Sequence, residues 1–366
     1  MNILVTGCEG FVGKNLLQWL KQKRPDDIVL GYDRRNADEL ADLCAQADFV
    51  FHLAGANRPA DDSEFGKDNT TFTETLLGHC KAAKAPPIVF SSSAQAQLDN
   101  PYGKSKKAAE DAVFAYGNAT GNNVFVYRLP GIFGKWCRPN YNSVVATFCH
   151  NIARDMPIEI RDPEHILHLV YVDDVCKAFL AALDGECEVQ NGFCAIRPVH
   201  ETTLGALADT LCAFRQGRND LSVPMLSNAL ERKLYSTYKS YLPDFSYPLV
   251  SNIDERGSFT EFLKSTDRGQ VSINVTKPGI TKGNHWHHTK TEKFLVVSGQ
   301  GKISFRKVGE TEIAQYNVCG DSPKVIDIPP GYVHSIANTG PSDLVTVMWA
   351  DEIFDPQNPD TFFEEV

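Results

Sequence analysis

Residues 279–299 read GITKGNHWHHTKTEKFLVVSG and carry His285, His287 and Glu292 between two glycines. Side chains alternate along a β-strand, so the two histidines are predicted to project from one face. A later segment, IPPGYVHSIAN, supplies His334. Three imidazoles and one carboxylate are a ligand set for a first-row metal that leaves room for substrate or water. The sequence therefore predicts a metal site made of these four side chains.

Short strand patterns surround this segment. From Leu249 onward, runs such as RGQVSINV, KFLVVSGQGKISFR and LVTVMWA alternate with turns rich in glycine and proline. Many short strands with turn signals are typical of a β-sandwich or jelly-roll barrel. Helical patterning stops just before, in the segment STYKSYLPDFSYPL. We therefore predict two domains, residues 1–245 and 246–366, and the chain length of 366 residues also favours two.

The N-terminal end predicts a nucleotide-binding fold. The apolar run NILVT is followed by three glycines spaced G-x-x-G-x-x-G and by the helical pattern FVGKNLLQWLKQK. Glycines let the backbone approach a pyrophosphate, and the N-terminus of the helix offers N–H groups to it. The predicted cofactor-binding residues are Gly7, Gly10, Phe11, Val12, Gly13, Asp33, Arg34, Arg35, Leu53, Ala54, Tyr102 and Lys106.

The end of the second strand leaves the type of nicotinamide cofactor open. Asp33 at this position normally bonds a ribose hydroxyl and favours NAD. Arg34 and Arg35 follow it, and arginine can hold the 2′-phosphate of NADP. The alternative interpretation of the two arginines is a solvated loop.

A Y-x-x-x-K pattern, Tyr102 to Lys106, follows the strand pattern PPIVFSSSA. On a helix the two side chains lie one turn apart on one face. A nearby ammonium lowers the pKa of a phenol, so the tyrosine can transfer a proton at neutral pH. An isolated Y-x-x-x-K indicates only a surface pair. After the glycine pattern and three serines, it predicts a catalytic tyrosine.

These motifs resemble the extended short-chain dehydrogenase/reductase family, which acts on nucleotide sugars. The resemblance covers roughly residues 1–245 and includes TGxxGxxG, HLAG, YRLPGIFG and YVDDVCKAF. It implies a Rossmann-type doubly wound sheet and makes Ser93 the catalytic hydroxyl. Ser93 and Tyr102 are only nine residues apart, where the family usually has a longer loop, and this implies a more open pocket. The implied substrate-binding residues in this part are Arg128, Lys135, Asn142 and His168.

The C-terminal segment fits the cupin signature G-x5-H-x-H-x4-E-x6-G at every fixed position. The nearby segment DERGSFTEF resembles deoxysugar 3,5-epimerases, which are cupins that act on nucleotide-bound 4-keto-6-deoxy sugars. This resemblance makes His285 a proton-abstracting base and places Arg256 among the substrate-binding residues. Those epimerases have uncharged amides where this chain has His287 and Glu292. Whether His285 is a free base or a metal ligand is therefore left open.

The acid that returns the proton is also open, with three candidates: Lys282, Asp327 and Tyr332. We include Lys282 with His285 among the predicted catalytic residues.

Composition excludes several other classes of protein. The net charge of −10 argues against nucleic acid as a partner. No apolar run reaches the roughly 18 residues needed to span a membrane, and the first residues enter a strand pattern rather than a signal peptide. Ten scattered cysteines without a C-x-x-C pair favour reduced thiols in a cytoplasmic protein.

Nearly the whole chain resembles the CapF/WbjC family of capsule and O-antigen synthesis enzymes, through segments such as NPYGKSK, GKWCRPNYNSVVATFC and FDPQNPDTFFEEV. The resemblance implies a homodimer that acts on a UDP-linked 2-acetamido 4-keto-6-deoxy sugar. A zinc-binding cupin domain would epimerise C3, and the reductase domain would then reduce C4 with NADPH. The product would be UDP-2-acetamido-2,6-dideoxy-L-talose, on the route to UDP-N-acetyl-L-fucosamine.

Two alternatives remain. In the first, the chain is a C4 reductase only, and the cupin is a non-catalytic binding or dimerisation module. In the second, the cupin is an iron-dependent dioxygenase.

Overall fold

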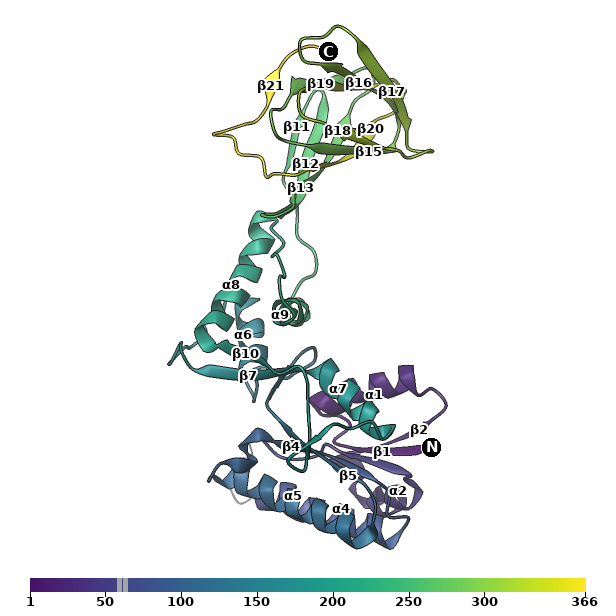
Figure 1. The fold of residues 1–366 in the computed structure, drawn as a ribbon, viewed down its shortest axis with the longest axis vertical. Coiled ribbons are helices and arrows are strands. Elements are labelled where there is room, and N and C mark those ends of the chain that lie inside the picture. The colour runs from purple at the N-terminus through teal and green to yellow at the C-terminus, as the bar shows by residue number, and fades with distance from the viewer. Residues whose placement is uncertain (58–60, 62–64) are drawn as a thin grey trace. The chain divides into compact units, whose positions relative to one another are not determined.

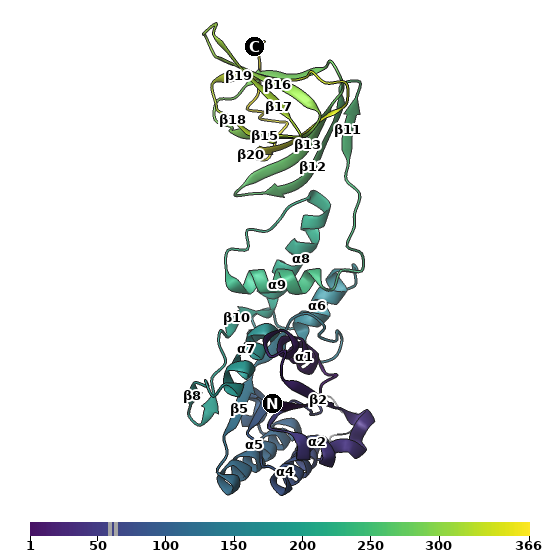
Figure 2. The ribbon, with the colours of Figure 1, turned by 90° about the vertical axis from the view of Figure 1, so that its right-hand side faces the viewer.

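The structure is a computed structural model that describes residues 1–57, 61 and 65–366 (Figures 1 and 2). Unit 1 consists of Met1–Leu211 and Asn228–Pro243, and unit 2 consists of Cys212–Ser227 and Asp244–Val366. The sequence prediction placed residues 212–227 in the first of two contiguous domains, whereas here they group with the second unit. The reason is a pair of backbone hydrogen bonds at 2.8 Å, from Val223 N to Lys264 O and from Lys264 N to Leu221 O.

Unit 1 is built on a parallel sheet of order β2-β1-β3-β4-β5. Its strands are β1 (Asn2–Thr6), β2 (Ile28–Tyr32), β3 (Phe49–His52), β4 (Ile88–Ser93) and β5 (Val124–Leu129). The helices packed on it are α1 (Phe11–Lys23) and α7 (Val172–Leu183) on one face, and α2 (Leu40–Gln46), α4 (Phe72–Ala82) and α5 (Pro101–Thr120) on the other (Figure 1).

Both faces of this sheet are buried. Ile3 and Val5 of β1 pack in the cluster that includes α1 and α7, while Leu4 between them packs in the cluster that includes α4 and α5. Strands covered on both faces read as continuous apolar runs, which explains the pattern NILVT. The predicted Rossmann-type doubly wound sheet is confirmed.

The remaining elements of unit 1 lie outside this sheet. They are η1 (Arg34–Glu39), η2 (Gly66–Thr71), η3 (Ala94–Gln97), α6 (Val144–Ile152) and α9 (Ala229–Lys239), with α8 (Leu204–Asp220) running from unit 1 into unit 2. Strands β6 (Gly131–Phe133), β7 (Ile166–Tyr171) and β10 (His200–Thr203) form a small sheet, and β8 (Val189–Gln190) and β9 (Phe193–Cys194) form a hairpin.

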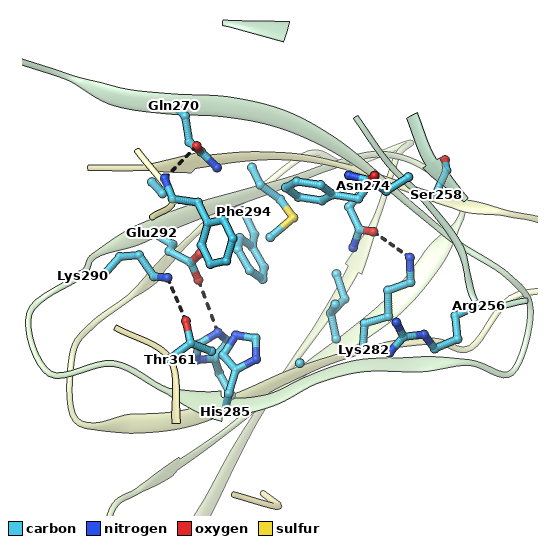
Figure 3. Close-up of a pocket in the computed structure, with 18 of the residues that line it drawn as sticks. Arg256, Ser258, Gln270, Asn274, Lys282, His285, Lys290, Glu292, Phe294 and Thr361 are labelled. Carbon is cyan, nitrogen blue, oxygen red and sulfur yellow. Dashed lines mark hydrogen bonds and ion pairs between the residues drawn. The ribbon is translucent and has the colours of Figure 1, made fainter. Parts of the chain in front are cut away.

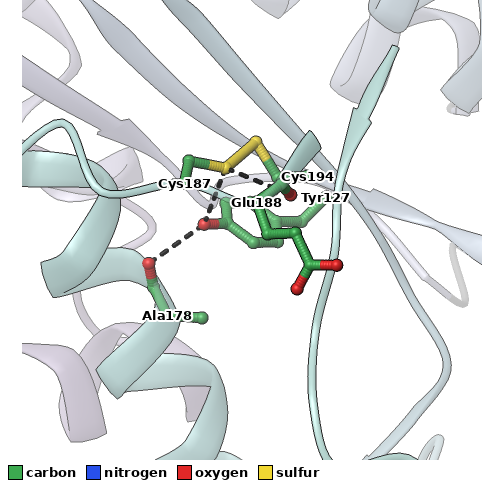
Figure 4. Close-up of a disulfide and its surroundings, with 5 residues drawn as sticks. All are labelled: Tyr127, Ala178, Cys187, Glu188 and Cys194. Carbon is green, nitrogen blue, oxygen red and sulfur yellow. Dashed lines mark hydrogen bonds between the residues drawn. A yellow bond between two sulfur atoms is a disulfide. The ribbon is translucent and has the colours of Figure 1, made fainter. Parts of the chain in front are cut away.

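The hairpin of β8 and β9 carries a disulfide between Cys187 and Cys194 (Figure 4). The prediction that all cysteines are reduced thiols is therefore wrong at this pair. The antiparallel pairing of the two strands brings the two Cα atoms to 6.2 Å, within the usual range for a disulfide. Six further cysteines are buried thiols: Cys8, Cys44, Cys80, Cys137, Cys149 and Cys176.

Unit 2 consists of two antiparallel sheets. One has the order β11-β12-β13-β20-β15-β18 and the other the order β17-β16-β19-β14-β21. Their strands are β11 (Ser251–Asp254), β12 (Gly257–Ser265), β13 (Gly269–Thr276), β14 (Thr281–Trp286), β15 (Glu292–Ser298), β16 (Gln300–Lys307), β17 (Ile313–Cys319), β18 (Val325–Ile328), β19 (Tyr332–Asn338), β20 (Leu344–Ala350) and β21 (Phe362–Phe363).

One apolar core joins the two sheets of unit 2. Phe294 and Leu344 from the first sheet pack in the same buried cluster as Ile303 and Ile336 from the second. Two antiparallel sheets that share one core form a sandwich, so the predicted jelly-roll barrel is confirmed.

Across both units, the described residues contain no helix with the length and apolarity needed to cross a membrane.

Candidate functional site

The turn between β1 and α1 can exist only with glycine at its key positions. Gly7 has φ +69°, and a Cβ there would lie 2.8 Å from the backbone nitrogen of Ala54. A Cβ on Gly13 would lie 2.2 Å from the carbonyl oxygen of Gly7. Helix α1 then begins at Phe11, and Gly10 at its N-cap offers no side-chain cap. The first N–H groups of the helix are therefore available to a phosphate.

The other predicted residues of this turn lie beside it. Val12 is in the first turn of α1. The N–H groups of Leu53 and Ala54 each donate to Thr6 Oγ1 at 3.2 Å, which fixes the end of β3 against the end of β1. The backbone that would face a dinucleotide is therefore held in place by its own hydrogen bonds.

The tip of β2 combines one carboxylate with two exposed guanidinium groups. Asp33 accepts hydrogen bonds from the backbone N–H of Arg35 at 2.7 Å and from its guanidinium at 2.5 Å, and these bonds lower the pKa of Asp33. Arg34 pairs with Asp68. The side chains of Arg34 and Arg35 are 84% and 76% exposed. Arg35 thus offsets the charge of Asp33, and both arginines reach solvent.

Ser93, Tyr102 and Lys106 come together from the end of β4 and the start of α5. The Ser93 side chain lies near enough to Tyr102 to lower its pKa, and the Tyr102 hydroxyl donates to Asn57 Oδ1 at 3.0 Å. Lys106 is 5% exposed, and its ammonium donates to the carbonyl oxygen of Ser91 at 3.2 Å. The three residues predicted to act together therefore lie together.

The protonation of this group differs from the prediction in one respect. Burial raises the pKa of Tyr102, and Ser93 offsets only part of that rise. Burial lowers the pKa of Lys106 to about 8. The expected lowering of the phenol pKa is therefore not found, because burial of Tyr102 outweighs the effects of its neighbours.

The four residues predicted to bind the sugar diphosphate are not gathered into one described cavity. Arg128 is held by two hydrogen bonds to the buried Glu110, at 2.9 and 2.7 Å, and lies 3.8 Å from the ring of Phe193. Arg128 therefore forms an ion pair that the sequence could not show, because Glu110 lies on a neighbouring helix. It also lines a cavity of about 330 Å³, so its role as a substrate ligand stays a prediction.

The other three residues of this prediction lie on separate elements. Lys135 donates to Asp173 at 2.6 Å. Asn142 is exposed in the segment before α6. His168 is exposed on β7, 3.7 Å from Glu201. Their proposed contact with a nucleotide sugar stays a prediction.

In unit 2, the four predicted metal ligands do converge. Their potential ligand atoms, from His285, His287, Glu292 and His334, all lie within 4.8 Å of one another. Glu292 Oε2 is 3.4 Å from His287 Nε2 and 3.3 Å from His334 Nε2. Burial alone would raise the pKa of Glu292, but the two imidazoles lower it below its usual value, so Glu292 is a carboxylate.

The tautomers of two imidazoles follow from their backbone partners. His287 Nδ1 lies 2.5 Å from the carbonyl oxygen of Asp360, and His334 Nδ1 lies 3.3 Å from that of Tyr332. A carbonyl only accepts, so each Nδ1 carries a proton, and each Nε2 points toward Glu292 and can bind a metal when it is deprotonated. His334 Nε2 is buried without a hydrogen-bond partner in the described chain. Imidazole nitrogens and a carboxylate oxygen that converge in this way fit a divalent metal ion.

A β-bulge aims His285 at the other ligands. Gly283 and Asn284 have φ values of +94° and +59°. Across β14 and β19, Gly283 pairs with Ser335 and His285 pairs with His334, which leaves Asn284 as an extra residue. Paired residues share a face of the sheet. Without the bulge, His285 would face away from His334.

The metal set lies in a cavity of about 640 Å³ that is lined by both sheets (Figure 3). Lys282, which is paired with Ile336 on the same face as His334, points into it and donates to Asn274 Oδ1 at 2.8 Å. Burial lowers the pKa of Lys282. Arg256 also lines the cavity, on the same side as Lys282 in Figure 3. The cavity thus has a metal set at one end and two cationic side chains at the other.

The two other candidate acids do not line this cavity. Asp327 is paired with Lys293 on an exposed surface, with 73% of its side chain accessible. Tyr332 packs against the apolar core through its ring. Of the three candidates, only Lys282 borders the cavity.

Sequence reasoning missed three polar residues of this site. Lys290 is 8% exposed, lines the cavity and donates to Thr361 Oγ1 at 3.1 Å. Asp360 contacts both the ring of His287 and the segment that follows it. Asp360 and Thr361 are about 70 residues from the ligands in sequence, so no local spacing could indicate them.

Comparisons with known families divide the chain in the same two parts. Residues 3–192 match the NAD dependent epimerase/dehydratase family, and residues 252–362 match the polysaccharide biosynthesis C-terminal domain.

Known proteins also resemble the whole chain. It is 42% identical over 367 aligned positions to the UDP-2-acetamido-2,6-beta-L-arabino-hexul-4-ose reductase of Pseudomonas aeruginosa, and the alignment covers 99% of this chain and 98% of that protein. The crystal structure of the capsular polysaccharide assembling protein CapF from Staphylococcus aureus superposes with a TM-score of 0.94 at 51% identity, with both chains fully covered. The spore coat polysaccharide biosynthesis protein SpsL of Bacillus subtilis is 24% identical over 124 residues, which are 31% of this chain and 81% of that protein.

Proposed function

Because this chain belongs to the NAD dependent epimerase/dehydratase family, and to the two-domain proteins that include CapF, we propose that it is a bifunctional nucleotide-sugar enzyme of polysaccharide synthesis. Unit 2 epimerises C3 of a UDP-linked 2-acetamido 4-keto-6-deoxy sugar. Unit 1 then reduces C4, which gives UDP-2-acetamido-2,6-dideoxy-L-talose for capsule or O-antigen synthesis. The observation that carries the proposal is the presence of two complete side-chain sets, Ser93–Tyr102–Lys106 and the four-ligand set, in one chain.

In unit 1, Tyr102 is the proton donor to the C4 oxygen in this proposal. Ser93, which lies near Tyr102, would bond the same oxygen. A bound nicotinamide would supply the hydride. With a pKa of about 8, Lys106 is protonated at neutral pH and can orient the ribose of that cofactor. Replacing the Asn57 contact of Tyr102 by the substrate oxygen would complete this arrangement.

We propose NADPH as the reductant. Arg34 and Arg35 are exposed at the tip of β2, where the 2′-substituent of the adenosine ribose lies in this fold. Arg35 also offsets the charge of Asp33, which would otherwise repel a 2′-phosphate.

In unit 2, the proposal assigns zinc to His285, His287, Glu292 and His334. The metal would stabilise negative charge on the C4 oxygen when C3 loses its proton. His285 borders the cavity and makes no side-chain hydrogen bond within the described residues, so we assign it to take the C3 proton when its imidazole is not bound to the metal. Lys282 borders the same cavity and is our candidate for returning a proton to the opposite face of C3.

The order of the two steps follows from the chemistry. A proton at C3 is acidic only while C4 is a ketone, because the resulting carbanion delocalises onto the ketone oxygen. Reduction at C4 destroys that ketone, so epimerisation comes first and reduction makes the inversion permanent. The homodimer implied by the family resemblance remains part of the proposal.

Product analysis tests the whole assignment. The purified chain is incubated in heavy water with the UDP-linked 4-keto sugar, with and without NADPH, and the products are identified by NMR. We expect deuterium at C3 without NADPH, and a C4-reduced, C3-inverted, deuterated sugar with it. If C4 is reduced and no deuterium appears at C3, the protein is a C4 reductase without epimerase activity.

A further inference from the structure

The segment that contains Asp360 contacts the ligand-bearing turn between β14 and β15 at several points. The Asp360 carboxylate accepts backbone N–H groups of His288, Thr289 and Lys290, at 2.8, 2.8 and 2.9 Å. It also accepts the Thr289 hydroxyl at 3.1 Å. Four donors therefore converge on one carboxylate. The turn between two metal ligands is therefore fixed by a residue outside it.

The backbone of Asp360 contacts a metal ligand directly. Its carbonyl oxygen lies 2.5 Å from His287 Nδ1, and the ring of His287 is 1% exposed. This contact sets the tautomer that turns His287 Nε2 toward Glu292. The same residue thus orients the ligand through its main chain and fixes the following turn through its side chain.

Neighbouring residues extend this contact along β14. Strand β21 pairs Phe363 with His285 and Phe362 with Trp286. Lys290 donates to Thr361 Oγ1 at 3.1 Å. Each residue from Asp360 to Phe363 therefore touches the backbone or a side chain of residues 285–290, and the segment covers the ligands from one side.

We propose that Asp360 is a positioning residue of the metal site, which keeps His287 and Glu292 at the spacing that a divalent ion needs. This inference rests on the metal in the proposed function. The carboxylate fixes the turn that joins the two ligands, and loss of that carboxylate frees the turn and the main-chain carbonyl bonded to His287. Loss of such an outer partner lowers metal affinity by about 10- to 100-fold.

The test measures metal affinity of the full chain after removal of metal with a chelator. Zinc is titrated into the wild type, Asp360→Ala and the control Asp355→Ala. Asp355 lies in the same C-terminal segment and accepts the Gln357 N–H at 2.9 Å and the Asn358 amide at 3.2 Å, and neither of these bonds, within the described part of the chain, reaches the ligand turn. We expect 10- to 100-fold weaker binding for Asp360→Ala and unchanged binding for the control.

Two further measurements separate positioning from folding. Thermal unfolding of the metal-free proteins should give the same midpoint for Asp360→Ala and wild type, and the visible spectrum of the cobalt-substituted variant should differ from that of the wild type. If Asp360→Ala does not fold, Asp360→Asn, which keeps one acceptor oxygen, takes its place.

The outcomes distinguish this inference from the proposed function. A wild type that binds no zinc overturns the metal site itself. A wild type that binds zinc, with a variant that binds it within twofold, overturns the role of Asp360. If metal-free Asp360→Ala is destabilised and its cobalt spectrum is unchanged, Asp360 has only a structural role. That result also overturns the inference.

Discussion

The catalytic groups of unit 1 and the metal set of unit 2 differ in how far the polypeptide alone assembles them. In unit 2, four side chains converge within 4.8 Å in a cavity of about 640 Å³. In unit 1, Ser93 and Tyr102 lie near one another, but Lys135, Asn142 and His168 lie on separate elements and are partnered or exposed. The four-ligand set of unit 2 is thus already assembled, whereas the predicted substrate-binding residues of unit 1 are not gathered in one described cavity.

The largest expected effect comes from Tyr102→Phe. The variant keeps the ring but loses the hydroxyl that donates the proton, so C4 reduction falls by at least about 100-fold. Deuterium exchange at C3 stays at the wild-type rate, because that step belongs to unit 2. NADPH oxidation and mass spectrometry measure the two steps on the same sample. Loss of exchange in this variant would contradict two independent sites.

Removal of a metal ligand should have the next largest effect. His334→Ala leaves three ligands and is expected to weaken zinc by more than the roughly 100-fold that loss of an outer partner costs. C3 exchange is then lost together with the metal. Elemental analysis and deuterium wash-in check this, with the exposed His165→Ala as control. Exchange that survives without metal would make the metal structural.

A smaller effect, on stability rather than chemistry, is expected for Arg128→Ala. The substitution leaves the carboxylate of Glu110, which is 0% exposed, with the Ser92 hydroxyl but without its cation. Removing one partner of a buried ion pair costs about 3–5 kcal/mol, whereas the exposed pair of Arg161 and Glu159 is screened by solvent and should contribute far less to stability. Urea unfolding of Arg128→Ala and Arg161→Ala compares them. An unchanged midpoint with a raised KM for the sugar would support the substrate-binding role of Arg128.

The smallest expected effect is on cofactor choice. Arg35→Ala removes a guanidinium from the tip of β2, and we expect the preference for NADPH over NADH in kcat/KM to fall about 10-fold, or about 1.4 kcal/mol. Arg35→Lys keeps the charge and should retain part of the preference. An unchanged ratio in Arg35→Ala would mean that the 2′-phosphate is bound elsewhere.

Local spacing predicted the folds and the gathering of most site residues, but not their partners. The glycines after β1 and the H-x-H segment are motifs that can be recognised within a few residues, so both folds and the four-ligand set could be predicted. Glu110 beside Arg128, and Asp360 beside His287, are contacts between distant elements that spacing does not encode. The disulfide of Cys187 and Cys194 was missed because a single pair among ten cysteines carries no recognisable pattern.

The bulge at Gly283 and Asn284 has a consequence for protein design. One extra residue resets the phase of β14, so that His285 stands opposite His334 rather than opposite Val333. The site is thus encoded in the backbone as well as in its ligands, since a one-residue slip turns every later side chain to the other face. A graft of the four ligands onto another β-sandwich must also transplant this bulge. A Cβ at Gly283 would lie 2.8 Å from the His334 carbonyl oxygen, so the graft must keep glycine there.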